Sequence, residues 1–141
     1  MNFGFYINRQ QQNYIENLIK ELISNNINTF ILYPYGEVSE FVSPIINKYN
    51  GTIKYYIDNY KNDGKFILSI EQAIKNKMGN EVILICNINE KYYNEIRENI
   101  YRAFPKDKII DLFPKVVMLE DSTNIEQDIK YLKSFVDEVQ L

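Results

Sequence analysis

The sequence of 141 residues contains no histidine, and it has only one cysteine, five glycines and four prolines. Without histidine, the chain cannot build a Ser-His-Asp or Cys-His catalytic pair, or a histidine metal site, from its own residues. The single cysteine, Cys86, cannot form a disulfide within the chain, which agrees with a reducing compartment. Cys86 also ends an apolar run, so we expect a core residue there. We therefore assign no catalytic residue and no metal ligand.

Several sequence patterns that mark other classes of protein are also missing. Lysine and arginine never form a long run and the net charge is only -3, which argues against a nucleic-acid partner. No apolar stretch approaches membrane-spanning length, and residues 1–9 do not resemble a signal peptide, so we expect a cytoplasmic protein without membrane insertion. The chain has no Walker A or EF-hand motif. It also has no tyrosine followed four residues later by lysine, the pair that sugar epimerases and short-chain reductases use.

The residues that are present predict one globular domain over 1–141. Hydrophobic residues make up 45% of the chain and charged residues 25%, which excludes a wholly disordered polymer. Apolar residues at helical spacing predict a helix over 8–25, and the Asn25 Asn26 pair after it can take a left-handed cap. The same spacing predicts a last helix over 122–140, which covers the sheet or meets a partner.

Residues 28–113 alternate between strand and helix patterns. Apolar and β-branched runs predict strands over 30–33, 52–57, 66–68, 81–86 and 108–113. Helical spacing follows the turn at 34–36, although Pro44 lies within that pattern. A second helix is predicted from the capping box of Ser69 and Gln72 to about Met78, and a third from Asn89 to Phe104.

This alternation predicts a three-layer, Rossmann-like α/β fold. We expect a five-stranded parallel sheet of order 3-2-1-4-5, with helices on both faces and an extra helix at each terminus. Ligands of such sheets bind at the carboxyl ends of the strands, beside the switch between the first and the fourth strand.

The first predicted strand and turn, 28–41, form the leading candidate site. A strand, a tight turn and a helix N-terminus are where α/β proteins hold phosphates. Gly36 would let the backbone approach a pyrophosphate, whereas Pro34 has no amide N–H to offer. The Ser39 hydroxyl can meet a phosphate or bond to the backbone, and a plain structural turn is the alternative.

Two polar residues follow other predicted strands at the same edge. Asp58 comes about 20 residues after the turn, where an acidic side chain accepts hydrogen bonds from ribose hydroxyls. Its alternative role is an Asx turn into Asn59. Asn87 follows the fourth strand, near any ligand, although it can instead cap the next helix.

The chain resembles the small Rossmann-like domain of nucleotide-sugar-dependent polysaccharide biosynthesis proteins, which is found attached to glycosyltransferases, sugar acyltransferases and methyltransferases. In that group the first turn reads Y-G-A-G-E-V-G. Gly36 takes the place of the second glycine, Glu37 and Val38 agree, Pro34 replaces the first glycine and Ser39 the third. The resemblance rests on the runs ILYPYGEVSEF, IKYYIDNY, EVILICNINEKYYNEI and KDKIIDLF.

The resemblance implies a nucleotide, a nucleotide-sugar or a dinucleotide such as NAD at this edge. Our hypothesis is an accessory binding domain for surface-polysaccharide or sugar metabolism that is not catalytic alone. One alternative is a sugar-nucleotide oxidoreductase or transferase completed by a partner enzyme. The other is a ligand-free interaction module, acting through its terminal helices as a homodimer or with a partner. The candidate binding residues are Tyr35, Gly36, Glu37, Val38, Ser39, Asp58 and Asn87.

Overall fold

The computed structural model describes residues 8–76, 79–105, 108–113 and 129–130. Its centre is a five-stranded, all-parallel sheet of order β3-β2-β1-β4-β5, which confirms the predicted topology. The strands are β1 (Thr29–Tyr33), β2 (Thr52–Ile57), β3 (Ile67–Leu68), β4 (Val82–Ile85) and β5 (Ile109–Asp111).

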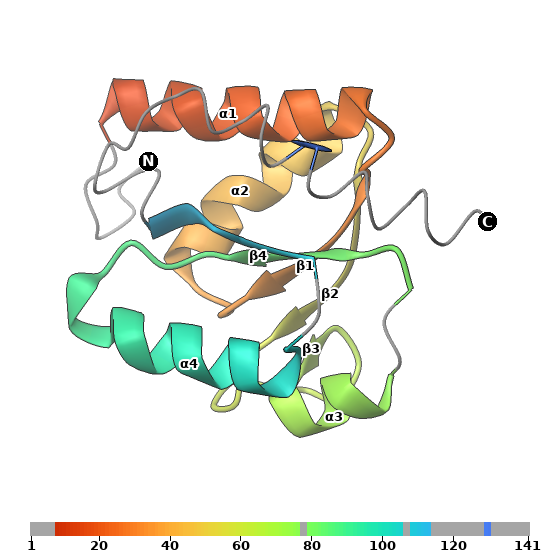
Figure 1. Ribbon diagram of the computed structural model, residues 1–141, viewed down its shortest axis with the longest axis vertical. Coiled ribbons are helices and arrows are strands. Elements are labelled where there is room, and N and C mark those ends of the chain that lie inside the picture. Colours follow the sequence, from red (N-terminus) through yellow and green to blue (C-terminus); the bar gives the residue numbers. More distant parts are fainter. Residues whose placement is uncertain (1–7, 77–78, 106–107, 114–128, 131–141) are drawn as a thin grey trace.

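Helices cover both faces of the sheet, giving the three layers of a Rossmann-like arrangement (Figure 1). Helices α1 and α2 lie on one face, and α3 and α4 on the other. The reason is that β1 to β2 and β4 to β5 step in opposite directions along the sheet, so right-handed crossovers place their helices on opposite faces. The helices are α1 (Arg9–Ser24), α2 (Glu37–Lys48), α3 (Ile70–Lys75) and α4 (Tyr93–Ala103), with the short 3-10 helix η1 (Glu90–Tyr92) before α4.

The two faces of β1 enter two separate cores. Phe30 and Leu32 belong to the core under α1 and α2, while Ile31 and Tyr33 belong to the core under α3 and α4. Because side chains alternate along a strand, this continuous apolar run indicates a central strand covered on both sides. Ile129, one of the two described residues in the predicted last helix, is partly buried against the α1 and α2 core.

Several local signals in the sequence are confirmed. Asn26 and Asn50 have positive φ angles of 66° and 67°, as expected where a helix stops and the chain reverses. At the start of α3, the Ser69 hydroxyl accepts from the Gln72 amide at 3.1 Å, and the Gln72 side chain accepts from the Ser69 amide at 2.9 Å. These caps supply partners for backbone groups that helix ends leave open.

Some predicted boundaries were wrong. The fifth strand ends at Asp111 and not at Phe113, because the Asp111 carboxylate accepts from the Phe113 amide at 3.0 Å and the chain turns helical there. Helix α3 ends at Lys75, before the predicted end near Met78. Helix α2, in contrast, starts at Glu37, directly after the turn as predicted, and Pro44 lies in its interior. The last predicted helix falls outside the described residues apart from 129–130, which are helical.

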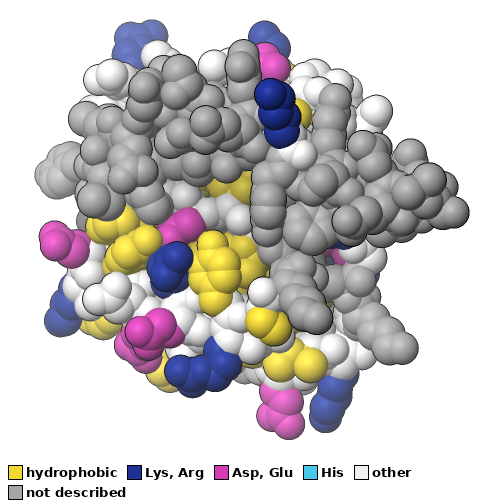
Figure 2. Space-filling model, viewed as in Figure 1, with side chains coloured by type: hydrophobic (Ala, Val, Ile, Leu, Met, Phe, Trp, Pro, Cys, Tyr) yellow, Lys and Arg dark blue, Asp and Glu magenta, His cyan; other side chains and the backbone are white. Residues whose placement is uncertain are grey.

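Charges of both signs are mixed on the face that Figure 2 shows, with hydrophobic side chains between them. No described helix has the length and apolar character needed to cross a bilayer.

Candidate functional site

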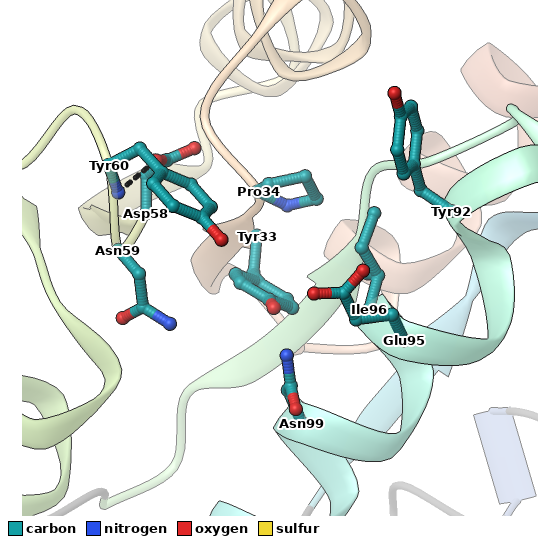
Figure 3. Close-up of a pocket in the computed structure, with 9 residues that line it drawn as sticks. All are labelled: Tyr33, Pro34, Asp58, Asn59, Tyr60, Tyr92, Glu95, Ile96 and Asn99. Atoms are coloured by element: carbon teal, nitrogen blue, oxygen red, sulfur yellow. Dashed lines mark hydrogen bonds between the residues drawn. The ribbon is translucent and has the colours of Figure 1, made fainter.

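A pocket of about 360 Å³ opens at the carboxyl ends of β1 and β2, on the α4 side of the sheet (Figure 3). This is the edge where open parallel sheets bind ligands, and the volume falls in the range of small-molecule sites. Three segments far apart in the sequence supply its walls. The lining residues are Tyr33 and Pro34 after β1, Asp58, Asn59 and Tyr60 after β2, and Tyr92, Glu95, Ile96 and Asn99 from η1 and α4.

Tyr33 is the most deeply buried of the pocket tyrosines, with 4% of its surface exposed. It is the last residue of β1, and its alternation with Leu32 directs it to the α4 side. Burial raises the pKa of its hydroxyl to about 12, and the Asp58 and Glu95 carboxylates add to the rise, while a hydrogen bond with Asn99 opposes it. Tyr33 therefore keeps its proton at neutral pH. The peptide bond from Tyr33 to Pro34 is cis.

Asp58 is the one predicted site residue that lines the pocket. Its Oδ1 accepts from the amides of Tyr60 at 2.8 Å and Lys61 at 2.9 Å, which is the turn-forming role that the sequence left open. No described residue is hydrogen-bonded to its other oxygen, Oδ2. The side chain therefore stabilises its own loop through one oxygen and has the second available for a ligand.

The rim of the pocket is aromatic and acidic. Tyr60 is 90% exposed and Tyr92 46% exposed, and the Lys91 ammonium lies 5.2 Å from the centre of the Tyr92 ring. Figure 3 shows these two side chains on opposite sides of the pocket, with the Glu95 carboxylate turned toward the space between them and Asn99 toward Tyr33. Of the nine lining residues, two are carboxylates and none is lysine or arginine.

Of the predicted phosphate turn at 34–36, Pro34 lines this pocket, whereas Tyr35 and Gly36 lie beside it. The Tyr35 amide donates to the Ile57 carbonyl at 3.1 Å, and the Gly36 amide donates to Ser39 Oγ at 2.8 Å. Because Pro34 has no amide hydrogen, these turn positions offer no open donor. The donors left for an anion are the first amides of α2, which no helical carbonyl can reach.

Side chains around the start of α2 have roles within the protein. Ser39 is fully buried and returns a hydrogen bond to the Gly36 carbonyl at 2.8 Å, so its hydroxyl bonds to the backbone. Tyr35 donates to Glu40 at 3.2 Å. Glu37 and Glu40 occupy the first turn of α2, where their charges suit the helix dipole and repel a phosphate.

Gly36 itself is not required by the fold. Its backbone is extended, with φ 174°, and a Cβ added there would meet no atom within 4 Å. This position can therefore be substituted to probe a ligand without disturbing the helix.

The other predicted residues are held inside the fold. Val38 is buried in the α1 and α2 core. The Asn87 side chain donates to the Asn89 carbonyl at 3.1 Å and accepts from the Asn89 amide at 3.2 Å, so it shapes the loop after β4. Cys86 is buried as predicted, and burial raises the pKa of its thiol, which leaves it unreactive.

Sequence reasoning missed most of the pocket. Tyr60 and Asn59 directly follow Asp58, and Tyr92 and Ile96 lie in the helix predicted over 89–104, but none of the four was a candidate binding residue. A usable signal was present, because Tyr92, Glu95 or Ile96, and Asn99 lie three or four residues apart on one helical stripe that mixes apolar and polar side chains.

Among the described residues, no cluster of cysteine and acidic side chains could hold a metal ion. Comparison with family models, curated proteins and solved structures finds no match.

Proposed function

We propose that the chain is an accessory Rossmann-like domain that binds a nucleotide or nucleotide-sugar in cytoplasmic surface-polysaccharide or sugar metabolism. The observation that carries the proposal is the pocket at the carboxyl ends of β1 and β2 with Asp58 in its wall. An acidic side chain at the end of the second strand is where Rossmann-like domains hold ribose hydroxyls. A carboxylate there favours an unphosphorylated 2′-hydroxyl, as in NAD.

The proposal assigns no reaction to the isolated chain. The titratable groups of the pocket are two carboxylates and three tyrosines. General acid-base catalysis works best when the pKa of the group lies near the working pH, and the pKa of Tyr33 lies far above it. This set of residues supports a role in which the domain binds a ligand and presents it to another domain or chain.

The test is ligand-observed NMR or calorimetry with adenine and uridine nucleotides, their sugars and NAD. We expect at least one to bind, and Asp58→Asn to weaken it about tenfold by removing the charged acceptor. Asparagine keeps the oxygen that the loop amides need. If none of these compounds binds, the proposal is wrong.

Asp63→Asn is the matched control for this variant. Asp63 makes the same kind of turn, accepting from the amides of Lys65 at 2.8 Å and Phe66 at 2.9 Å, but it does not line the pocket. We expect Asp63→Asn to leave the affinity unchanged.

Gly36→Ala tests whether phosphates rest on the start of α2. The added methyl group has open space around it, so the fold should be unaffected. If phosphates approach the backbone here, the variant weakens phosphorylated ligands and leaves the unphosphorylated nucleoside unchanged. If Gly36→Ala leaves the affinity for the phosphorylated ligands unchanged as well, the phosphates lie elsewhere.

An enzyme completed by a partner chain is the second candidate. The exposed rings of Tyr60 and Tyr92 favour it, because a partner could close the open side of the pocket against them. This candidate predicts turnover of a nucleotide-sugar only when the partner, sought among the products of neighbouring genes, is added.

A further inference from the structure

We infer that the pocket takes the uncharged, hydroxyl-bearing part of its ligand, a nucleoside or sugar ring, and leaves the phosphate groups outside, with the Glu95 carboxylate accepting a hydrogen bond from a ligand hydroxyl. The inference rests on the proposed function and specifies which part of the ligand enters the pocket.

The charge of the pocket is the first support. Asp58 and Glu95 line it from two different elements, and no basic residue among the nine compensates them. Both carboxylates raise the pKa of the Tyr33 hydroxyl, and Tyr33 lines the same pocket. A phosphate placed between them would be repelled by both, more strongly than in water because the pocket is partly enclosed.

The hydrogen-bonding groups give the second support. The carboxylates of Asp58 and Glu95 offer hydrogen-bond acceptors, whereas the Tyr33 hydroxyl and the Asn99 amide both donate and accept. Sugar hydroxyls also donate and accept, so they can pair with every member of this set. A phosphate has hydrogen-bond acceptors alone. A cation such as a quaternary ammonium would suit the charge of the pocket, but it has no hydrogen-bonding group to pair with these side chains.

The exposed aromatic rings give the third support. Tyr60 and Tyr92 stand on opposite sides of the pocket, with Tyr60 almost fully exposed and Tyr92 about half exposed (Figure 3). A flat base or the apolar face of a sugar would cover ring surface on entering, and base-aromatic stacking contributes favourably to binding.

Glu95 is suited to carry the test. It is exposed on α4, and no hydrogen bond or ion pair joins it to another described residue, so Glu95→Gln should fold normally. Glu98 is exposed on the same helix and does not line the pocket. Glu98→Gln is therefore a control with the same change of charge and chemistry.

The experiment measures dissociation constants for adenosine, uridine and their 5′-mono- and diphosphates by NMR at low ionic strength. The direction in which Glu95→Gln changes these dissociation constants shows whether a hydroxyl or a phosphate lies beside Glu95. If a hydroxyl meets Glu95, the variant weakens every member of the series by a similar factor, about three- to tenfold, while Glu98→Gln stays within about twofold of wild type. The 2′-deoxynucleosides should bind more weakly than the ribonucleosides.

Three outcomes would overturn the inference. Tighter binding of the phosphorylated members to Glu95→Gln would place a phosphate in the pocket, because repulsion has then been relieved. Equal behaviour of Glu95→Gln and Glu98→Gln would remove Glu95 from recognition. If tetramethylammonium displaces the nucleoside at a concentration below the dissociation constant of the nucleoside, the pocket is a cation site.

The proposed function and this inference fail separately. Nucleotides that bind with no response to Glu95→Gln leave the proposed function standing and refute the inference. Free ribose or glucose that binds with a loss in Glu95→Gln, while no nucleotide binds, supports the inference and refutes the proposed function.

Discussion

The hydroxyl of Tyr93 donates to Asp111 Oδ2 at 2.8 Å and so joins the first residue of α4 to the last residue of β5. The Tyr93 ring also stacks on Phe113, with centroids 4.0 Å apart and planes 19° from parallel. Arg97 Nε lies 3.7 Å from the same Asp111 oxygen. These contacts fix α4 against the sheet edge, and α4 supplies one wall of the pocket.

Tyr93→Phe should therefore destabilise the protein while keeping the ring stack. Asp111 is 9% exposed and would lose a hydrogen bond in a partly desolvated setting, at a cost of about 1–2 kcal/mol in the free energy of unfolding. Urea denaturation measures this change. Tyr92→Phe removes a hydroxyl from the neighbouring exposed residue and should have no such effect, and equal losses in the two variants would contradict the prediction.

Gly51→Ala should destabilise the turn between α2 and β2. A Cβ at Gly51 would lie 2.8 Å from Ile46 Cγ2 and 2.9 Å from Ile23 Cδ1, inside the core under α1 and α2. Overpacking of this kind costs about 1–3 kcal/mol in the free energy of unfolding. Gly36→Ala makes the same change in open space and should stay within about 0.5 kcal/mol of wild type. Thermal and urea unfolding of the two variants test the contrast, which equal stabilities would refute.

Alkaline pH should weaken the fold through Tyr33. Its pKa is raised from 10.0 to about 12, chiefly by burial, so between these values the folded state holds a proton that the unfolded state has released. Stability is therefore fully present below pH 10.0 and is lost as the pH rises through the folded pKa of about 12. Urea midpoints across this range measure the loss. Tyr33→Phe should make the decline shallower, and an unchanged slope would rule out this residue as a contributor.

Acid should weaken the contact between Lys54 and Glu81. Burial opposes the charge of Glu81, but the Lys54 ammonium at 2.7 Å and the Gly79 amide at 2.6 Å outweigh it and hold the pKa of Glu81 below 4.5. The contribution of this contact to the free energy of unfolding is present above pH 4.5 and is lost as the pH falls through the lower pKa of Glu81 in the folded state.

Glu81→Gln should accordingly flatten the pH dependence of the free energy of unfolding below pH 4.5. Glu71→Gln, at an exposed residue with no ion pair to a described residue, is the control and should leave the acid slope as in wild type. An acid slope that is the same in Glu81→Gln as in wild type would contradict the assignment.

The order and type of the core elements follow from the sequence because their causes are local. The run from Phe30 to Tyr33 predicts a central strand by its lack of polar alternation, and Ser69 with Gln72 predicts a helix start by its spacing. The sheet has the predicted order 3-2-1-4-5, and the right-handedness of crossovers then places each connecting helix on one face.

The turn shows where local reasoning stops. Its strand, turn and helix were predicted from the sequence, and the possibility that Ser39 bonds to the backbone was stated. That the Tyr35 amide is taken up by the Ile57 carbonyl was not predictable, because this contact depends on the position of β2 beside β1. The availability of a backbone donor is a property of its tertiary neighbours.

The pocket itself was decided by tertiary structure alone. Asp58 was a candidate from its place after a strand, and the stripe of Tyr92 and Glu95 was readable, but no local pattern joins that stripe to Tyr33 or Asp58. They meet because α4 packs across the ends of β1 and β2, which brings residues far apart in the chain into one cavity. The sequence determined which elements form, since the spacing of apolar and capping residues acts locally. The charge and shape of the site arose only when those elements packed.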